Sequence, residues 1–140
     1  MIRIPQNIID GIIAQARNEL PNEACGLLVG NENEVVKQFP LTNIDHSPEH
    51  FSFDPREQFG VLKEARSLGL QIIANYHSHP ESPARPSEED IRLAFDPDII
   101  YIILSLQEET PVIKAFSIKN GTVEQIEMDR MSQVSNKCGT

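Results

Sequence analysis

Basic side chains, cysteines and tryptophan are scarce or absent in this 140-residue sequence. Its 12 lysine and arginine residues are outnumbered by 21 aspartate and glutamate residues, and the formal net charge is -9. The chain therefore offers no general basic field for phosphates, which makes nucleic acid a poor partner and favours a protein with a basic face. Two cysteines, Cys25 and Cys138, do not make a disulfide framework. Cys25 lies in an apolar segment, which favours a buried core residue over a nucleophile.

Long apolar runs are absent as well. No stretch of about 18 apolar residues occurs, so no membrane span is expected. The N-terminus lacks the basic stretch and the apolar run of a signal peptide, and we expect a cytoplasmic protein. No glycine-rich phosphate loop accompanies a strand-to-helix junction, so a nucleotide-binding function has no positive support.

The length and composition predict a single globular domain. A hydrophobic content of 39% in 140 residues is in the ordinary globular range, and one core is enough at this size. We expect the domain to cover residues 1–128. Residues 129–140 contain little to bury and are expected to form a disordered tail.

The spacing of apolar residues predicts an α/β fold, with a mixed sheet and helices packed against it. A first helix should follow Pro5 and stop by Pro21, and a second should begin after Asp54. Phe59, Leu62 and Ala65 are expected to face inward from the second helix. The other predicted elements are strands over 24–29, 35–39, 70–76 and 99–106, a helix start at 87–90 with apolar residues following to 95, and strands over 112–118 and 122–128 that flank a turn at Asn120-Gly121.

Four residues have the chemistry and spacing of a catalytic metal site. His77 and His79 are two positions apart, so their side chains emerge on the same side of an extended backbone. Asp90 could return at the first turn of the next helix as a third, anionic ligand. Three protein ligands leave one tetrahedral position for water, which a catalytic zinc requires. Glu23 begins another strand and could collect the proton of that water.

Each of these residues also has a simpler interpretation. An isolated His-x-His pair is more often a surface pair or a satisfied pair than a metal site. Ser87 and Asp90 could form a helix capping box, in which Asp90 favours the helix N-terminus. Glu23 could be a solvated residue at the end of a strand. The individual residues leave these alternatives open.

Taken together, the residues resemble the JAMM (MPN+, Mov34/PAD-1-like) zinc metallopeptidase family. The resemblance extends over nearly the whole chain, and within the family it is greatest for small stand-alone prokaryotic members, some of which process ubiquitin-like sulfur-carrier proteins. The histidines, the serine and the aspartate have the spacing of the family motif without an insertion. The matching segments are Glu23-Ala24-Cys25-Gly26-Leu27-Leu28, His77-Ser78-His79-Pro80 and Ser87-Glu88-Glu89-Asp90.

The resemblance implies both a site and an activity. It implies that His77, His79 and Asp90 bind one zinc ion per chain, that Glu23 is the general acid/base, and that Ser87 hydrogen-bonds the oxyanion, so that capping and catalysis compete for its hydroxyl. It also implies a three-layer α/β fold like that of cytidine deaminases. The expected activity is a zinc-dependent peptidase or isopeptidase that cuts after a C-terminal Gly-Gly, with a ubiquitin-like (β-grasp) sulfur carrier as substrate.

Two rival functions make different demands on the sequence. A zinc deaminase needs a His-x-Glu element and a later Pro-Cys-x-x-Cys pair, and neither is present. A metal-free interaction scaffold of the same fold would have no need of all five motif residues. Ser78 and Pro80 are expected to shape the loop, and we assign them no chemical role. The lack of the long insertions of some eukaryotic relatives puts recognition of lysine-linked ubiquitin chains in doubt, and the sequence does not predict an oligomeric state.

Overall fold

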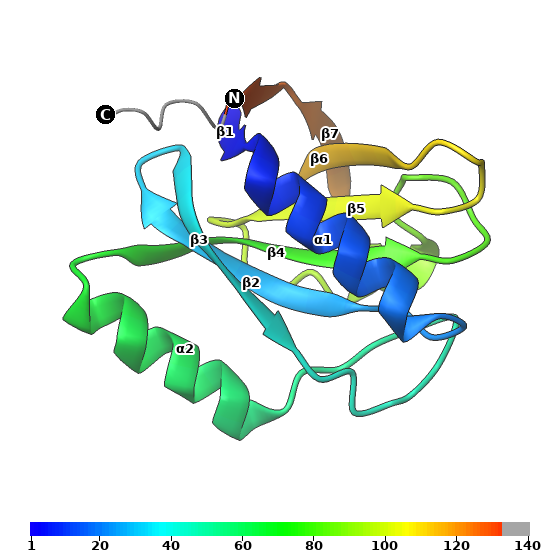
Figure 1. Cartoon of the computed structure of the whole chain (residues 1–140), viewed down its shortest axis with the longest axis horizontal. Coiled ribbons are helices and arrows are strands. Elements are labelled where there is room, and N and C mark those ends of the chain that lie inside the picture. Colours follow the sequence, from blue (N-terminus) through cyan, green and yellow to red (C-terminus); the bar gives the residue numbers. More distant parts are fainter. Residues whose placement is uncertain (133–140) are drawn as a thin grey trace.

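A computed structural model describes residues 1–132 as an eight-stranded mixed sheet flanked by helices (Figure 1). The predicted α/β class is therefore confirmed. The helices are α1 (Gln6–Glu19), α2 (Pro55–Ser67) and the short α3 (Glu88–Arg92). The strands are β1 (Ile2–Pro5), β2 (Cys25–Asn31), β3 (Glu34–Leu41), β4 (Gln71–His79), β5 (Ile100–Ser105), β6 (Val112–Lys119), β7 (Thr122–Ile126) and β8 (Met128–Met131).

The strand order places β4 in the middle of the sheet. The order is β7-β6-β5-β4-β2-β3-β1-β8, so β7 and β8 form the two edges. β4 pairs antiparallel with β2 and parallel with β5, and its backbone is therefore engaged on both sides. The antiparallel pairing brings the start of β2 beside the end of β4, with Cys25 opposite His77. Residues far apart in the sequence consequently meet at this end of the sheet.

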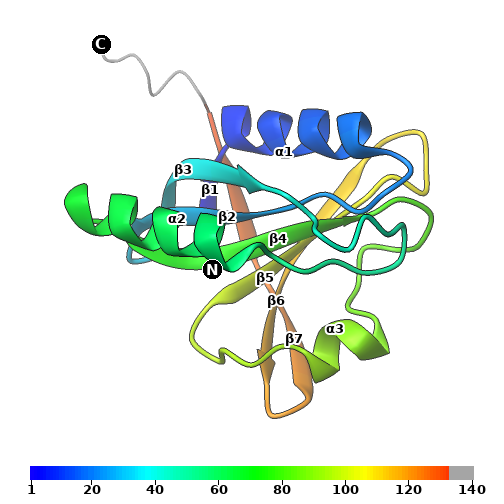
Figure 2. The ribbon, with the colours of Figure 1, turned by 90° about the horizontal axis from the view of Figure 1, so that it is seen from below.

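Helices cover both faces of the sheet. Ile9 and Ile12 of α1 are fully buried in a cluster that contains Leu28 of β2. Val61 and Ala65 of α2 pack in a separate cluster on the other face. Figure 2 shows α1 above the strands and α3 below them. The core is thus divided by the sheet, as a layered α/β fold requires.

One predicted helix face is partly wrong. Ala65 is buried and Leu62 is half-buried, but Phe59 is 59% exposed. Val61 and Ala65, one turn apart, form the stripe of α2 that contacts the sheet. Since successive residues of an α-helix are rotated by about 100°, Phe59 lies about 200° from Val61 and therefore points to solvent.

Two further helix predictions differ from the structure at their C-terminal ends. The first helix was expected to stop by Pro21, but α1 ends at Glu19, and the apolar Leu20 after it is 47% exposed. α3 ends at Arg92, and the apolar residues Leu93 and Phe95 after it are 48% and 81% exposed. In both places apolar residues continue for a few positions after the helix has ended.

The N-terminus and the last described strand form an edge that apolar spacing did not predict. Ile2 and Ile4 of β1 are buried, and β1 pairs in parallel with β8, from Ile2 opposite Met128 to Pro5 opposite Met131. The expected domain boundary at residue 128 therefore falls inside a strand. The remainder of the predicted tail, residues 133–140, lies outside the described residues.

The hairpin at Asn120-Gly121 is confirmed. Both residues have positive φ values, 51° and 80°, as a tight turn between twisted strands requires. Within residues 1–132, no helix is both long enough and apolar enough to cross a membrane. The cytoplasmic location stays a prediction.

Candidate active site

His77, His79 and Asp90 converge at the end of β4. The two histidine Nε2 atoms lie 3.1 Å apart. The Oδ2 atom of Asp90 lies 3.2 Å from Nε2 of His77 and 3.1 Å from Nε2 of His79. Both histidines are buried, whereas Asp90 is half-buried at the surface of the site. The structure therefore brings together all three residues that the sequence predicts as metal ligands.

The outer ring atoms of the two histidines have different surroundings. Nδ1 of His79 lies 2.8 Å from the carbonyl oxygen of Pro83, which can only accept a hydrogen bond. This contact assigns the proton of the neutral ring to Nδ1 and leaves a lone pair on Nε2, the atom that faces Asp90. The ring of His77 stacks on Phe51, with ring centroids 4.6 Å apart, and its buried Nδ1 has no hydrogen-bond partner in the described part of the chain.

A capping box positions Asp90. The backbone N–H of Asp90 donates to Oγ of Ser87 at 3.0 Å, and the backbone N–H of Ser87 donates to Oδ2 of Asp90 at 2.9 Å. In this cap the serine oxygen is an acceptor, and its hydroxyl hydrogen stays available as a donor. Capping and an oxyanion contact therefore do not compete for the hydroxyl, contrary to our expectation from the sequence.

Glu23 lies two residues before the start of β2 and is 3% exposed. Its backbone is held by three contacts: its N–H donates to the carbonyl of Ser47 at 2.8 Å, its carbonyl accepts from Nδ2 of Asn43 at 3.0 Å, and the next N–H, that of Ala24, donates to Oγ of Ser78 at 2.8 Å. The side-chain atom Oε1 is buried without a hydrogen-bond partner within residues 1–132. The alternative interpretation of Glu23, a solvated residue at the end of a strand, is therefore wrong.

Ser78 and Asn43 have structural roles that the sequence did not indicate. Ser78, between the two histidines, connects β4 to the backbone after Glu23. Asn43 is 4% exposed and lies in a turn-rich stretch, where its amide donates to Glu23 and to His50 and accepts from the backbone N–H of Asp45. A buried asparagine in a loop often replaces missing backbone partners, but nothing in its local sequence specifies Glu23 as one of them.

The buried carboxyl groups of the site have opposite pKa shifts. Burial raises the pKa of Glu23 to about 8, although the nearby His79 partly opposes this effect. Burial also acts to raise the pKa of Asp90, but its close contacts with His77 and His79 hold that pKa well below its usual range. Without a metal ion, Asp90 is therefore ionised at neutral pH, while Glu23 retains its proton.

The two histidines also differ in their protonation equilibria. Burial lowers the pKa of His77. Burial acts in the same direction on His79, but the contacts with Asp90 and with the Pro83 carbonyl outweigh it and raise the pKa of His79. At neutral pH the two histidines therefore do not both carry a positive charge.

The donor set fits a zinc ion. Two imidazole nitrogens and a carboxylate oxygen are zinc ligands of the usual kind, and the three ligand atoms lie within 4.8 Å of one another. Two unprotonated Nε2 atoms at 3.1 Å would repel each other unless a proton or a cation lay between them. The buried Oε1 of Glu23 adds a polar group near this set that no residue of the described part of the chain satisfies.

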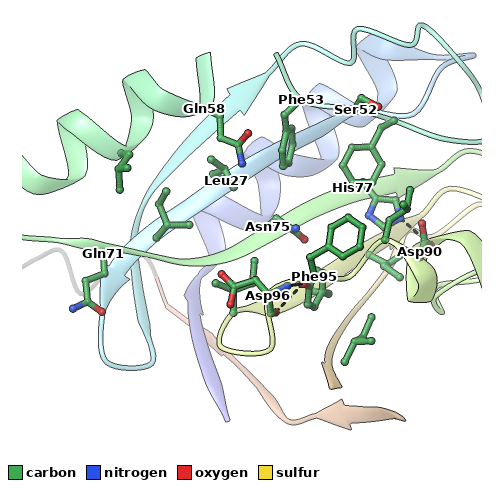
Figure 3. A pocket seen from close by; sticks show the side chains of 18 of the residues that line it. Leu27, Ser52, Phe53, Gln58, Gln71, Asn75, His77, Asp90, Phe95 and Asp96 are labelled. Carbon is green, nitrogen blue, oxygen red and sulfur yellow. Dashed lines mark hydrogen bonds and ion pairs between the residues drawn. The ribbon is translucent and has the colours of Figure 1, made fainter. Parts of the chain in front are cut away.

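A groove leads to the cluster of His77, His79 and Asp90 along one face of the sheet. It encloses about 1130 Å³, has His77 and Asp90 in its wall, and extends beside α2 to Gln71 at the start of β4. Figure 3 shows His77 and Asp90 toward one end and Gln71 toward the other. Most of its lining is apolar, including Leu27, Phe51, Phe53, Ile72, Tyr101 and Ile103. This shape suits an extended, largely apolar or glycine-rich segment.

Comparisons with known proteins agree with this geometry. A family model described as prokaryotic homologs of the JAB domain matches residues 5–119. A CysO-cysteine peptidase of Mycobacterium tuberculosis is 30% identical over 125 residues, which covers 87% of this chain and 86% of that protein. A solved structure from Desulfitobacterium hafniense has a TM-score of 0.89 at 46% identity and covers 98% of this chain and 97% of its own. A JAB1/MPN domain protein from Archaeoglobus fulgidus, with a TM-score of 0.63 and 23% identity over 93% of this chain and 97% of its own, shows the same fold.

Proposed function

Because this chain belongs to the family of prokaryotic homologs of the JAB domain, we propose that it is a zinc-dependent peptidase or isopeptidase that cuts after the C-terminal Gly-Gly of a ubiquitin-like sulfur carrier. The family predicted from the motif is confirmed, and with it the hydrolase class. The observation that carries the finer proposal is the meeting of His77, His79 and Asp90 beside a buried carboxyl group that has an unpaired oxygen.

His77, His79 and Asp90 would hold one zinc ion per chain. Such an ion lowers the pKa of a water molecule that it binds to about 7 and polarises the carbonyl group under attack. The capping box holds Asp90, and the Pro83 carbonyl holds His79, so two of the three side chains are oriented by the protein itself.

Glu23 and Ser87 supply the proton transfers and the oxyanion contact. The unpaired Oε1 of Glu23 can accept a proton from the attacking water, and the same carboxyl group can give it to the departing amine. The Ser87 hydroxyl accepts the Asp90 N–H and still has a hydrogen to donate to the developing oxyanion. These roles need no further side chain at the reacting centre.

The groove and one relative support the proposed substrate class. A glycine-rich tail has no side chains to clash with the walls of the groove, so it can reach the metal site in extended form while the globular part of the substrate stays outside. The Mycobacterium tuberculosis relative is named a CysO-cysteine peptidase. We therefore propose a small β-grasp carrier with an amino acid or a short extension after Gly-Gly as the substrate.

The test combines zinc-loaded protein with a carrier-Gly-Gly-X substrate, and the products are weighed by mass spectrometry. We expect release of X and a carrier ending in Gly-Gly. Glu23→Gln should keep its zinc and lose about 10² to 10⁴ in rate, the usual value of general acid/base help. Should the carrier remain intact while unrelated unfolded peptides are cut, the substrate class is wrong. Folded protein without stoichiometric zinc would instead favour a scaffold.

A further inference from the structure

The floor of the groove cannot bind a peptide as an additional strand. It is formed by β2, β4 and β5, which are interior strands whose backbone groups already pair with each other. Leu27, Asn75 and Tyr101 are directly opposite one another across these three strands. Among the described residues, none from the edge strands β7 and β8 lines the groove. Side chains must therefore bind any polar groups of a peptide main chain on this floor.

Asn75 is a polar side chain in the apolar part of this floor. It lies two residues before His77 on β4, and Figure 3 shows it between Leu27 and Phe95, with His77 on the side of the metal site. Its Oδ1 atom is buried and has no hydrogen-bond partner within residues 1–132. Buried acceptors without a partner are rare in native proteins, and each one calls for an explanation.

The neighbouring hydroxyl on the floor does not have this free capacity. The Tyr101 hydroxyl donates to the carbonyl of Asp96 at 2.8 Å and accepts from the Asp96 N–H at 3.2 Å. Asn75 differs because its amide carries the donor and the acceptor of a peptide group, and its acceptor oxygen has no partner among the described residues. It can therefore pair with a peptide group of a bound chain.

We propose that Asn75 is a specificity-determining residue that binds the main chain of the substrate tail, its amide turning on binding so that Oδ1 accepts a backbone N–H. This inference rests on the proposed peptidase function. Two residues of extended strand span about 7 Å, so a tail lying along β4 presents to Asn75 a peptide group about two residues from the bond at the metal site. Asn75 thereby sets the register that places the bond after Gly-Gly at His77 and Asp90.

The test compares Asn75→Leu, which keeps the approximate size and removes both polar atoms, with Asn18→Leu. Asn18 is an exposed asparagine of α1 that does not line the groove, and it is the matched control. We expect Asn75→Leu to keep stoichiometric zinc and to lose about 10-fold in kcat/KM for carrier-Gly-Gly-X. A loss of this size is typical when one hydrogen bond to a buried group is removed. Asn18→Leu should stay close to the wild type.

A second measurement separates binding of the main chain from a purely structural role. In a series of tail peptides, each backbone N–H in turn is replaced by an ester oxygen. The wild type should lose about 10-fold at one position, about two residues before the scissile bond, and Asn75→Leu should show no loss there. Equal losses in both proteins would refute the inference. If Asn75→Leu does not fold, a wild-type series without any sensitive position refutes it as well.

The outcomes for the inference and for the proposed function are distinct. If the wild type cleaves the carrier and Asn75→Leu cleaves it with the same kcat/KM, Asn75 does not bind the tail and the peptidase function stands. If the zinc-loaded wild type does not cleave the carrier or the tail peptides, the proposed function is wrong and the role of Asn75 is wrong with it.

Discussion

Glu23→Gln should make the metal-free protein more stable at pH 8 but not at pH 4. Glu23 is 3% exposed, and burial raises its pKa from 4.5 to about 8. Below pH 4.5 the carboxyl group is protonated in both the folded and the unfolded chain, so it adds no pH dependence to the stability. Between pH 4.5 and about pH 8 the unfolded chain releases the proton of Glu23 and the folded chain keeps it. The folded state therefore loses stability as the pH rises, and above about pH 8 the loss is complete.

The two pKa values determine the size of the effect. They differ by about 3 to 4 pKa units, and each unit is worth about 1.4 kcal/mol, so the folded wild type loses up to about 5 kcal/mol relative to the variant. Glutamine has nearly the same shape and does not ionise, so the variant lacks this loss. Asp90 and His79 titrate in both proteins, and their contributions largely cancel in the difference.

The measurement is urea unfolding of both proteins in the presence of a chelator, at intervals from pH 4 to pH 9. The difference in the free energy of unfolding should be constant below about pH 4.5, grow in favour of Glu23→Gln up to about pH 8, and then level off. Pre-treatment with the chelator matters because a bound cation would lower the pKa of Glu23. A difference that does not change with pH would refute the argument that Glu23 is buried with a raised pKa.

Three further predictions concern the ligands, the capping serine and the buried thiol. His79→Ala should lose stoichiometric zinc, whereas His50→Ala, which removes a side chain that is 49% exposed, should retain it in metal analysis; zinc retained by His79→Ala would contradict the ligand assignment. Ser87→Ala should lose about 10² to 10³ in kcat as an oxyanion donor and about 1 kcal/mol of stability as a helix cap, and an unchanged rate would leave only the cap. Burial raises the pKa of Cys25 to about 12, so in a Cys138→Ser protein iodoacetamide at pH 8 should label the unfolded chain and not the folded one; rapid labelling of the folded chain would show that Cys25 is accessible.

Local patterns were sufficient to predict most elements of the fold. The helix after Pro5, the cap at Asp54 and the turn at Asn120-Gly121 each depend on neighbouring residues, and the structure has all three. The pairing of β1 with β8 joins residues at opposite ends of the chain, and no local signal specifies it. The orientation of Phe59 was mispredicted for a related reason, because the face of α2 that contacts the sheet is decided by distant strands.

The site shows the same division between local and distant information. The alternation of a strand places His77 and His79 on one side, and the capping box places Asp90 at the start of α3. The proximity of Glu23 to them requires β2 to lie beside β4, which only the sheet order supplies. The motif of the family provided that information in place of geometry. Asn75 belongs to no motif that we recognised, and its role became visible only through its unpaired oxygen.

The distribution of unpaired polar atoms connects the metal site with the groove. Within residues 1–132, the buried side-chain oxygen and nitrogen atoms without a partner are Oε1 of Glu23, Nδ1 of His77 and Oδ1 of Asn75. Each costs stability, typically about 1 to 3 kcal/mol, and a protein selected for stability alone would not gather them in one region. His77 and Asn75 line the same groove, and Glu23 is held beside His77 by the contact of Ser78 with Ala24. Because a proton donor, a cation or a peptide N–H can satisfy such atoms, their gathering indicates a region built to bind ligands rather than to complete the core.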